Sequence, residues 1–465
     1  MTTDANPAIA AVTDVLRAAG HPSSVLLRTV VIGADASTRL PEVVAAIGTG
    51  TGRVRVLADP VPFSREGASD VKTSLARLVG GELVTVGAAG HAGGQRVHAD
   101  EATVVDVVER TRGADVLVTI GSGTLADLGK VAAGVHGIPH VVVQSAASVN
   151  GFTDDHSVLL RDGVKRTTPS RWPSALVADT TLIREAPVSL NAAGVGDLLA
   201  MFVGPADWLL AASLGIGPGY RPDMVDLVRP HGARLLELAH GLEAGDPGDV
   251  EDLTRLLALS GLTMGLSRCT APSSGTEHAI AHLLEMRLGE EAAWHGLQVG
   301  VATIAASRLW ERVRDHLRRH GPGSRLPDVD ATRERVLAAF GPLDPSGATA
   351  AECWAGYARK LTWLAANPDR LDDLLSRWDR LDQRLEPLLA TAVQLADGLR
   401  GSAVPLRFTD LGAAYDRSTV AWAVGHGHLM RDRFTVADLA DLLGIWSTTD
   451  VETMLDELAA DGLVT

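Results

Sequence analysis

Residues 115–130, DVLVTIGSGTLADLGK, decide the fold of this chain. A run of β-branched residues ends in a glycine-rich turn, and the turn opens directly into a helical pattern, which is the unit that builds parallel α/β sheets. Gly121 and Gly123 would let the backbone approach a pyrophosphate closely. The amides of Ser122 and Thr124 would hold it at the positive end of the helix. The alternative is a plain tight turn, because the sixth position of the glycine pattern is an alanine.

Strands and helices also alternate on both sides of this unit, and this alternation predicts an N-terminal α/β domain over residues 1–185. Buried strands are expected at 28–35, 53–60, 82–90, 115–123 and 139–146, with helices at 40–48, 70–81 and 101–114. This alternation favours a parallel sheet that is covered by helices on both faces. Such sheets bind their ligands at the carboxyl ends of the strands.

Beyond about residue 181 the pattern changes to long helical periodicity without a further convincing strand. We therefore expect an all-helical second domain over residues 186–465. Its last stretch, 434–465, superficially resembles a helix-turn-helix, but it has seven acidic residues and no Lys or Arg. Phosphates would repel a helix of that charge. The stretch is instead expected to form a helix pair that closes the core.

Composition excludes several functions. The chain has 465 residues with 42 basic against 57 acidic side chains and a net charge of −15, so it lacks the basic character of a nucleic-acid binder. We find no apolar run of about 18 residues and no secretory pattern at the N-terminus, and therefore expect no membrane span. The two cysteines, Cys269 and Cys353, cannot form a disulfide framework. A reduced, cytoplasmic protein is expected.

Polar residues after two further predicted strands are candidates for ligand contact. Asp35 ends the first strand, where an acid can bind a ribose hydroxyl of a dinucleotide. The alternative is a solvated acid or a helix cap. Ser145 lies at the end of the strand predicted at 139–146 and Ser148 follows it, and both could contact phosphate or ribose, while Asn150 could face a substrate. An ordinary polar loop is the alternative for these three.

Three residues of the second domain suggest a metal site, namely Asp197, His278 and His295. One carboxylate and two imidazoles suit Zn²⁺, Fe²⁺ or Ni²⁺, and three protein ligands leave positions open for a substrate. His278 and His282 are four residues apart, so both lie on one face of a helix. The chain has 15 histidines, and the alternative is that these are ordinary histidines of the core.

Together these segments resemble the sn-glycerol-1-phosphate dehydrogenases, especially their bacterial branch, within the iron-containing alcohol dehydrogenase and dehydroquinate synthase-like superfamily. The family pattern GGGT-x-x-D-x-x-K recurs as GSGTLADLGK at 121–130, and PTA-x-S-x-D-G recurs as QSAASVNG at 144–151. The metal patterns recur as AAGVGD at 192–197, SGTEHAIAH at 274–282 and HGLQVG at 295–300. The matches keep their order from about residue 28 to residue 305.

The resemblance implies a dehydroquinate synthase-like fold and a role for each candidate. The implied metal ligands are Asp197, His278 and His295. The residues implied to line an NAD(P) site are Asp35, Gly121, Ser122, Gly123, Thr124, Asp127, Ser145 and Ser148. The residues implied to act in catalysis are His282 as a proton relay, Asn150 and Lys165. Those implied to contact the substrate are Asn150, and Lys165 with Arg166 for its phosphate.

The resemblance further implies a metal-dependent NAD(P)H oxidoreductase that interconverts a small ketone phosphate and its alcohol. Dihydroxyacetone phosphate and sn-glycerol 1-phosphate, or a related polyol, are the implied substrates. The implied cofactors are NAD(H) or NADP(H) and one divalent ion of zinc, nickel or iron, and a homodimer or larger homo-oligomer is expected. Two departures bear on the substrate: Gln144-Ser145 replaces Pro-Thr, and Asn150 replaces an Asp. The Asn side chain keeps the size but exchanges a charge for an amide donor.

Two alternatives remain at the level of sequence. One is a lyase or cyclase like dehydroquinate synthase, which uses bound NAD for transient oxidation. The other is a non-catalytic homologue that binds a nucleotide as a sensor. A site with three metal ligands and open positions argues against the sensor, because a sensor needs no open Lewis acid.

Overall fold

The computed structural model describes residues 8–48, 52–63, 70–87, 97–161, 163–321, 323 and 326–464. The chain forms two compact units. The first comprises Met1–Arg161, Lys165–Gly194 and Leu238–Arg268, and the second comprises Asp162–Val164, Val195–Glu237 and Cys269–Thr465. These units differ from the single boundary predicted at residue 185. The difference arises because α11 (Pro247–Ser267) returns to the first unit, where it packs on α1 (Val12–Ala18) and α6 (Thr180–Ile183).

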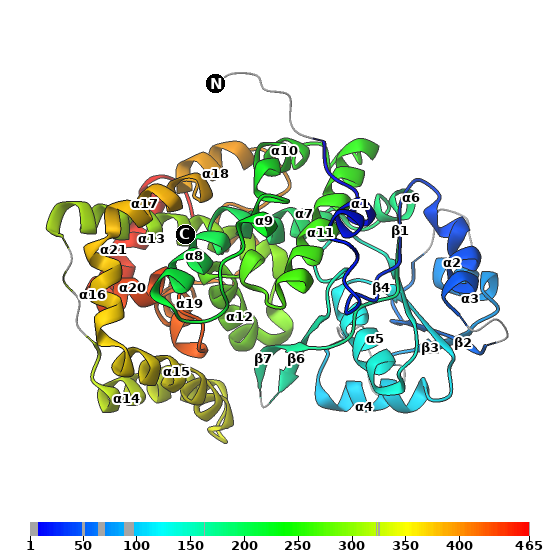
Figure 1. Cartoon of the computed structure of the whole chain (residues 1–465), viewed down its shortest axis with the longest axis horizontal. Coiled ribbons are helices and arrows are strands. Elements are labelled where there is room, and N and C mark those ends of the chain that lie inside the picture. The colour runs from blue at the N-terminus through cyan, green and yellow to red at the C-terminus, as the bar shows by residue number, and fades with distance from the viewer. Residues whose placement is uncertain are drawn as a thin grey trace. The chain divides into compact units, whose positions relative to one another are not determined.

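A six-stranded sheet forms the centre of the first unit, and every strand pair in it is parallel (Figure 1). The order of the strands in space is β1-β8-β5-β4-β2-β3. Their bounds are β1 Thr29–Gly33, β2 Val54–Ala58, β3 Glu82–Thr85, β4 Val116–Gly121, β5 His140–Gln144 and β8 Ala175–Asp179. The five predicted strands are thus confirmed, although residues 88–90 of the third prediction lie outside the described residues.

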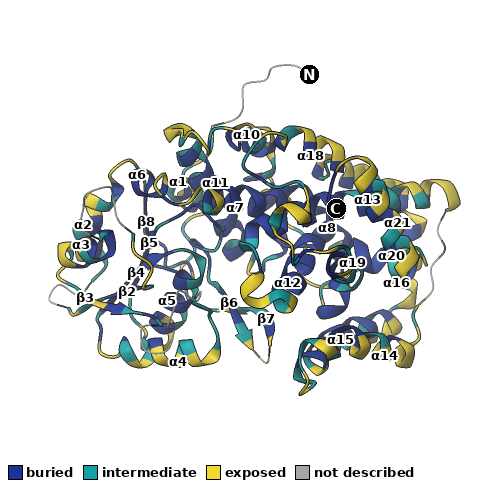
Figure 2. Cartoon of the chain, turned by 180° about the vertical axis from the view of Figure 1, so that it is seen from behind, coloured by how far each residue is buried: buried dark blue, intermediate teal, exposed yellow. Residues whose placement is uncertain are grey.

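Helices cover both faces of this sheet, as predicted. Val118 and Ile120 of β4 pack in one core with α2 (Leu40–Ile47) and α3 (Val71–Leu78). Leu117, which points the other way, packs in a second core with α4 (Glu101–Arg110) and α5 (Gly123–His136). Because β4 is covered on both faces, it is buried along its whole length (Figure 2). This double burial explains its nearly continuous apolar sequence.

The sequence analysis did not predict three of the strands. β6 (His156–Arg161) and β7 (Val164–Pro169) form a separate two-stranded sheet, and β8 joins the main sheet between β1 and β5. The sequence VKRTTP of β7 carries charged and hydroxyl side chains and resembles a polar loop, and HSVLLR of β6 has only a short apolar run between polar residues. β8 is only five residues long and leads directly into α6, so its signal merges with the helical pattern that follows.

The direction in which successive strands are added reverses beside β4. β2 leads outward to β3 at one edge of the sheet, whereas β4 leads to β5 and then β8 on the other side. Ligands of open α/β sheets bind at such a switch point, outside the carboxyl ends of the strands. The glycine-rich turn that follows β4 therefore lies where the topology favours a nucleotide.

The second unit is built of helices joined by short turns. One helix, α7 (Val188–Leu198), begins in the first unit and ends in the second. The others are α8 Gly204–Leu214, α9 Pro222–Val225, α10 Gly232–Leu238, α12 Thr276–Leu288, α13 His295–His320, α14 Val329–Phe340, α15 Ala348–Ala366, α16 Pro368–Ser376, α17 Trp378–Leu385, α18 Ala392–Leu399, α19 Arg417–His426, α20 Val436–Leu442 and α21 Thr448–Ala460.

The helix pair predicted at 434–465 is confirmed by α20 and α21. Asp438 in the first turn of α20 is buried, and its Oδ1 lies 2.5 Å from the equally buried Lys360 Nζ of α15. One acid of this stretch therefore neutralises an internal cation, which accords with a role in the core.

One apolar stretch, Val188–Leu214, is long and hydrophobic enough to cross a membrane by composition alone. In the structure it comprises α7, a 3₁₀ turn (Leu199–Phe202) and α8, and 94% of its most apolar window is buried. Burial in the core accounts for this composition.

Candidate active site

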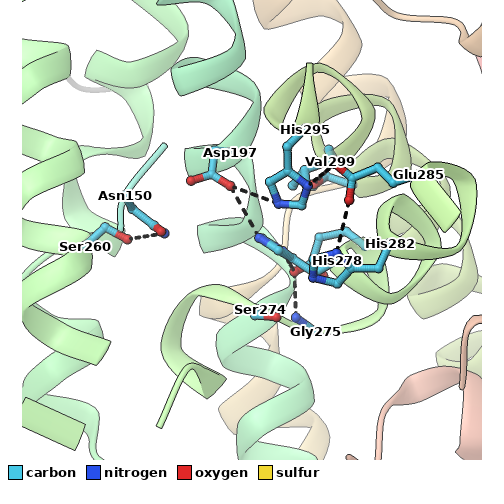
Figure 3. Close-up of polar contacts among 12 residues, drawn as sticks. Asn150, Asp197, Ser260, Ser274, Gly275, His278, His282, Glu285, His295 and Val299 are labelled. Carbon is cyan, nitrogen blue, oxygen red and sulfur yellow. Dashed lines mark hydrogen bonds and ion pairs between the residues drawn. The ribbon is translucent and has the colours of Figure 1, made fainter. Parts of the chain in front are cut away.

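Helix ends in the second unit bring the three predicted metal ligands together (Figure 3). Asp197 lies near the end of α7, His278 lies in the first turn of α12, and His295 is the first residue of α13. One ligand atom from each side chain lies within 4.8 Å of the other two. A carboxylate and two imidazoles that are distant in sequence therefore converge on one point.

Glycines permit this convergence. A Cβ atom on Gly196, next to Asp197, would lie 2.1 Å from the carbonyl oxygen of Gly296, next to His295. The end of α7 and the start of α13 are therefore in direct backbone contact. Any larger residue at position 196 would force α7 and α13 apart. It would thereby also separate Asp197 from His295. The GVGD and HGLQVG patterns thus supply the close approach as well as the ligands.

The distances between the ligand atoms suit a single metal ion. Asp197 Oδ1 lies 3.3 Å from His278 Nε2 and 3.9 Å from His295 Nε2. Metal–ligand bonds of about 2.0–2.1 Å at tetrahedral angles separate neighbouring ligand atoms by about 3.3–3.4 Å. The spacing and the donor set therefore fit a divalent cation, and three protein ligands leave room for a substrate oxygen.

A glutamate behind His278 orients its ring. Glu277 Oε1 lies 2.9 Å from His278 Nδ1 and accepts a hydrogen bond from the Gly275 amide at 2.6 Å. A carboxylate at Nδ1 makes Nε2 the nitrogen that is available to a metal. Burial alone lowers the pKa of His278, but the hydrogen bonds to Asp197 and Glu277 outweigh burial and raise it to about 9.

This raised pKa predicts how the metal affinity depends on pH. Below its pKa of about 9 the free protein holds a proton on His278, and the metal must displace that proton. We therefore expect the apparent affinity for Zn²⁺ to rise about tenfold per pH unit up to about pH 9. A histidine with the ordinary pKa of about 6.5 would instead give a plateau above about pH 7. Chelator competition across this pH range distinguishes the two curves, and an early plateau would contradict the expectation.

His282 and Glu285 extend the cluster along α12. His278, His282 and Glu285 follow one another at intervals of four and three residues and so share one helix face. Glu285 Oε2 lies 3.2 Å from His282 Nδ1, and Oε1 lies 3.3 Å from His295 Nδ1. The rings of His282 and His295 stack with centroids 5.1 Å apart. The sequence analysis missed Glu277 and Glu285, although the helical spacing of Glu285 could have indicated it.

A buried carboxylate of α8 fixes the loop in front of α12. Asp207 accepts hydrogen bonds from the Thr276 amide at 2.7 Å and from the Val436 amide at 2.9 Å. Burial and the neighbouring charge of Glu277 raise the pKa of Asp207 to about 7. Asp207 therefore holds the turn from which Glu277 and His278 project. No motif marked this residue in the sequence.

The predicted phosphate-binding turn lies in the first unit, where Gly121 ends β4 and Gly123 begins α5. The Ser122 side chain makes no capping hydrogen bond to the described first turn of α5, so these amides suit an anion. A Cβ atom on Gly121 would lie 2.7 Å from Leu125, and one on Gly123 would lie 2.8 Å from Val149. Both glycines are therefore required by packing, whether or not a phosphate binds.

The serines predicted to contact the nucleotide follow β5. The Ser145 amide donates to the Gly121 carbonyl oxygen at 3.0 Å, which joins the loops after β4 and β5. Ser148 is buried. The structure thus places Ser145 beside the glycine-rich turn, as a shared nucleotide site requires, and Thr124 lies in the first turn of α5.

Asp127 has a structural partner that the resemblance did not imply. Lys130 Nζ lies 3.1 Å from Asp127 Oδ1 and 2.7 Å from Asp154 Oδ1. Asp127 Oδ2 also accepts a hydrogen bond from the Val158 amide at 3.1 Å. Its carboxylate thus belongs to a buried ion-pair group, and a contact with the cofactor stays a prediction.

Asp35 is exposed beyond the carboxyl end of β1, with a left-handed backbone (φ 55°). Its amide donates to Asp179 Oδ1 at 3.1 Å, so the end of β8 holds this turn. Three strand spacings separate β1 from β4, which amounts to about 14 Å at about 4.8 Å each. Asp35 would therefore contact a part of a dinucleotide other than its pyrophosphate.

The three remaining candidates also lie in the first unit. Asn150 is buried, and its Nδ2 donates to Ser260 Oγ of α11 at 3.1 Å (Figure 3). A Cβ atom on Gly261 would lie 2.2 Å from the Asn150 carbonyl oxygen, so this loop packs directly on α11. Lys165 and Arg166 are half-buried in β7. Their contact with a substrate stays a prediction.

The chain is similar in sequence to known dehydrogenases. Residues 31–187 match the family model of iron-containing alcohol dehydrogenases. A glycerol-1-phosphate dehydrogenase [NAD(P)+] of Bacillus velezensis is 28% identical over 337 residues, which cover 72% of this chain and 71% of that protein. Its counterpart from Halalkalibacterium halodurans is 33% identical over 50% of this chain and 59% of that protein.

Solved structures share the fold. A probable glycerol dehydrogenase from Sinorhizobium meliloti 1021 superposes with a TM-score of 0.56 at 17% identity, covering 92% of this chain and 98% of that chain. Glycerol dehydrogenase from Schizosaccharomyces pombe gives a TM-score of 0.56 at 14% identity, covering 93% of this chain and 91% of that chain. These likenesses show that the chain shares the fold of these two structures.

Proposed function

We propose that this chain is a metal-dependent NAD(P)H oxidoreductase that interconverts a ketone phosphate and its alcohol, because residues 31–187 match the family model of iron-containing alcohol dehydrogenases and the curated relatives are glycerol-1-phosphate dehydrogenases. The observation that carries this proposal is the convergence of Asp197, His278 and His295 at ligand distances. When bound, a divalent metal ion would polarise the substrate oxygen and a dihydronicotinamide would supply the hydride.

The second unit supplies the residues for the metal and the proton. Asp197, His278 and His295 would hold the ion, and Glu277 keeps His278 in the tautomer that presents Nε2. His282 lies one helical turn beyond His278, and its Nδ1 is 3.2 Å from Glu285. Its Nε2 is therefore the nitrogen suited to exchange a proton with the substrate oxygen.

The first unit would hold the nucleotide and the substrate phosphate. The amides that follow Gly121 would bind the pyrophosphate, and Asp35 would bind a ribose hydroxyl. Lys165 and Arg166 would bind the substrate phosphate through charge-assisted hydrogen bonds. We propose dihydroxyacetone phosphate and sn-glycerol 1-phosphate as the substrate pair, because the curated relatives are glycerol-1-phosphate dehydrogenases.

We also propose the identity of the metal and of the nicotinamide cofactor. Zinc, nickel and iron all accept one carboxylate and two imidazoles, so each is a candidate for the resident ion. An acid at the ribose would repel a 2′-phosphate, so we propose that NADH is preferred over NADPH. A cytoplasmic homo-oligomer is proposed as the working form.

The test compares dihydroxyacetone phosphate with unphosphorylated dihydroxyacetone, using NADH and NADPH and protein loaded with each metal in turn. We expect stoichiometric oxidation of NADH and a kcat/KM about 10–100-fold higher for the phosphate ester, because hydrogen bonds to charged groups contribute about 1.5–3 kcal/mol. Chiral analysis should identify the product as sn-glycerol 1-phosphate. Turnover of a substrate with no net change in nicotinamide absorbance would favour the lyase or cyclase, and no turnover of any ketone phosphate would refute the proposal.

A further inference from the structure

One carboxylate in the cluster contacts two imidazoles with different predicted tasks. Glu285 Oε2 lies 3.2 Å from Nδ1 of His282, the predicted proton relay, and Oε1 lies 3.3 Å from Nδ1 of His295, a predicted metal ligand (Figure 3). The Glu285 and His282 side chains are 9% and 7% exposed. Water therefore competes little for these contacts.

The two contacts use the same nitrogen of each ring. The contact with His282 has the geometry of a hydrogen bond. The contact with His295 is at hydrogen-bonding distance but off the ideal direction, and the buried His295 Nδ1 has no hydrogen bond to any described residue. A buried donor without an acceptor is costly. Since Glu285 is at hand, it is the acceptor that a small turn of the His295 ring would engage.

A carboxylate can satisfy both rings at once because it has two acceptor oxygens and no donor. When it accepts from both Nδ1–H groups, each ring is neutral with its lone pair on Nε2. That tautomer is required of His295, whose Nε2 faces Asp197 at 3.9 Å. The same tautomer makes Nε2 of His282 a proton acceptor.

We propose that Glu285 is a shared positioning residue that holds His295 and His282 in the same tautomer and thereby couples the metal ligand to the proton relay. The half that concerns His282 rests on the proposed dehydrogenase function, whereas the half that concerns His295 requires only a metal. Glu285 itself touches neither the metal nor the substrate in this proposal.

The same atoms allow a competing arrangement. His282, Glu285 and His295 also form a group whose ligand atoms lie within 4.8 Å of one another, so a second metal ion is conceivable there. His295 would then have to bind two ions, one through each ring nitrogen. The number of metal ions bound per chain separates this arrangement from the positioning role.

The decisive variant is Glu285→Gln, which preserves shape but replaces one acceptor oxygen by an NH₂ donor. The amide can accept from one ring only and faces the other with a donor, which drives that ring to the opposite tautomer. We expect the Zn²⁺ dissociation constant, measured by chelator competition on the metal-free protein, to rise about 10–100-fold. We expect kcat to fall in a similar range while KM for dihydroxyacetone phosphate changes little.

Two further variants serve as a conservative substitution and as a matched control. Glu285→Asp keeps both acceptor oxygens on a shorter stem and should recover part of the metal affinity and of kcat. Glu291→Gln makes the same chemical change at an exposed position of the following turn (Gly289–Glu291) and should behave as the wild type. Thermal melting of each metal-free variant shows whether the fold is retained, and Glu285→Asp still tests the role if Glu285→Gln does not fold.

The outcomes separate this proposal from the proposed function. Wild-type metal affinity and wild-type kcat in Glu285→Gln would overturn the positioning role. Two zinc ions per wild-type chain and one per variant chain would replace it by a second metal site. If the wild type turns over no ketone phosphate, the dehydrogenase proposal fails, but the metal-affinity measurements still decide whether Glu285 orients His295.

Discussion

Replacement of His278 or His295 by alanine is expected to remove the bound metal and turnover together. Among the described residues, each imidazole is one of three predicted ligands that converge here, and Asp197 Oδ1 lies 3.3 Å and 3.9 Å from their Nε2 atoms. A three-ligand site that loses one ligand retains two, which is too few to hold an ion that water also coordinates. Elemental analysis of the purified variants measures the metal content directly.

The nucleotide affinity of these variants serves as an internal control. The residues predicted to hold the pyrophosphate, around Gly121, belong to the first unit, while both histidines belong to the second. NADH binding, measured by fluorescence titration, should therefore be largely retained. His320→Ala is the matched variant, because it removes an exposed histidine from the same helix as His295. Full metal content and normal rates in both His278→Ala and His295→Ala would show that these histidines are ordinary core residues.

A large loss of stability is expected when Lys130 is replaced by methionine. Lys130 is 1% exposed and lies between Asp127 and Asp154, at 3.1 Å and 2.7 Å from their carboxylates. It also donates to the Gly151 carbonyl oxygen at 3.0 Å, so it holds the loop that follows Asn150. Removal of one partner leaves buried charge uncompensated, which costs about 3–5 kcal/mol.

This loss should appear as a fall in melting temperature of about 10 °C, given about 2–4 °C per kcal/mol for a unit of this size. Arg112→Met is the matched control, because it removes a cation from a pair that is 69% and 60% exposed. Exposed pairs contribute about 0–1 kcal/mol, so that variant should melt within a few degrees of the wild type. Equal effects of the two substitutions would mean that burial of the Lys130 group does not govern its energy.

Some features of the first unit could be predicted because their signals are local. The strand–turn–helix at 115–130 was recognised from the β-branched run of β4 and the glycines that follow it, and both glycines prove necessary for packing against Leu125 and Val149. β7 was missed because its charged and hydroxyl side chains leave no apolar run, and β6 was missed because its apolar run, 158–160, is short. A strand that is stabilised mainly by its pairing partner carries little signal of its own.

In the second unit, too, some residues of the site have a local sequence signal and others have none. The predicted metal ligands could be named from sequence patterns, and the helical spacing on α12 could have added Glu285. Asp207 could not be found in this way, because its importance comes from two amides far away in the chain, those of Thr276 and Val436. Hydrogen-bond partners that are distant in sequence leave no pattern around the residue that accepts them.

The sequence by itself indicated most of the elements of this protein and its candidate chemistry: a parallel sheet with a glycine-rich turn after β4, a helical second half, and a carboxylate with two imidazoles that are predicted to bind a metal. Tertiary structure alone decided which helix joins which unit and how closely the ligands approach. α11 is buried along most of its length, and because hydrophobic attraction has no direction, its sequence does not specify which core it enters. The ligand spacing likewise depends on the backbone contact of Gly196 with Gly296, which forms only when packing brings two distant helices together.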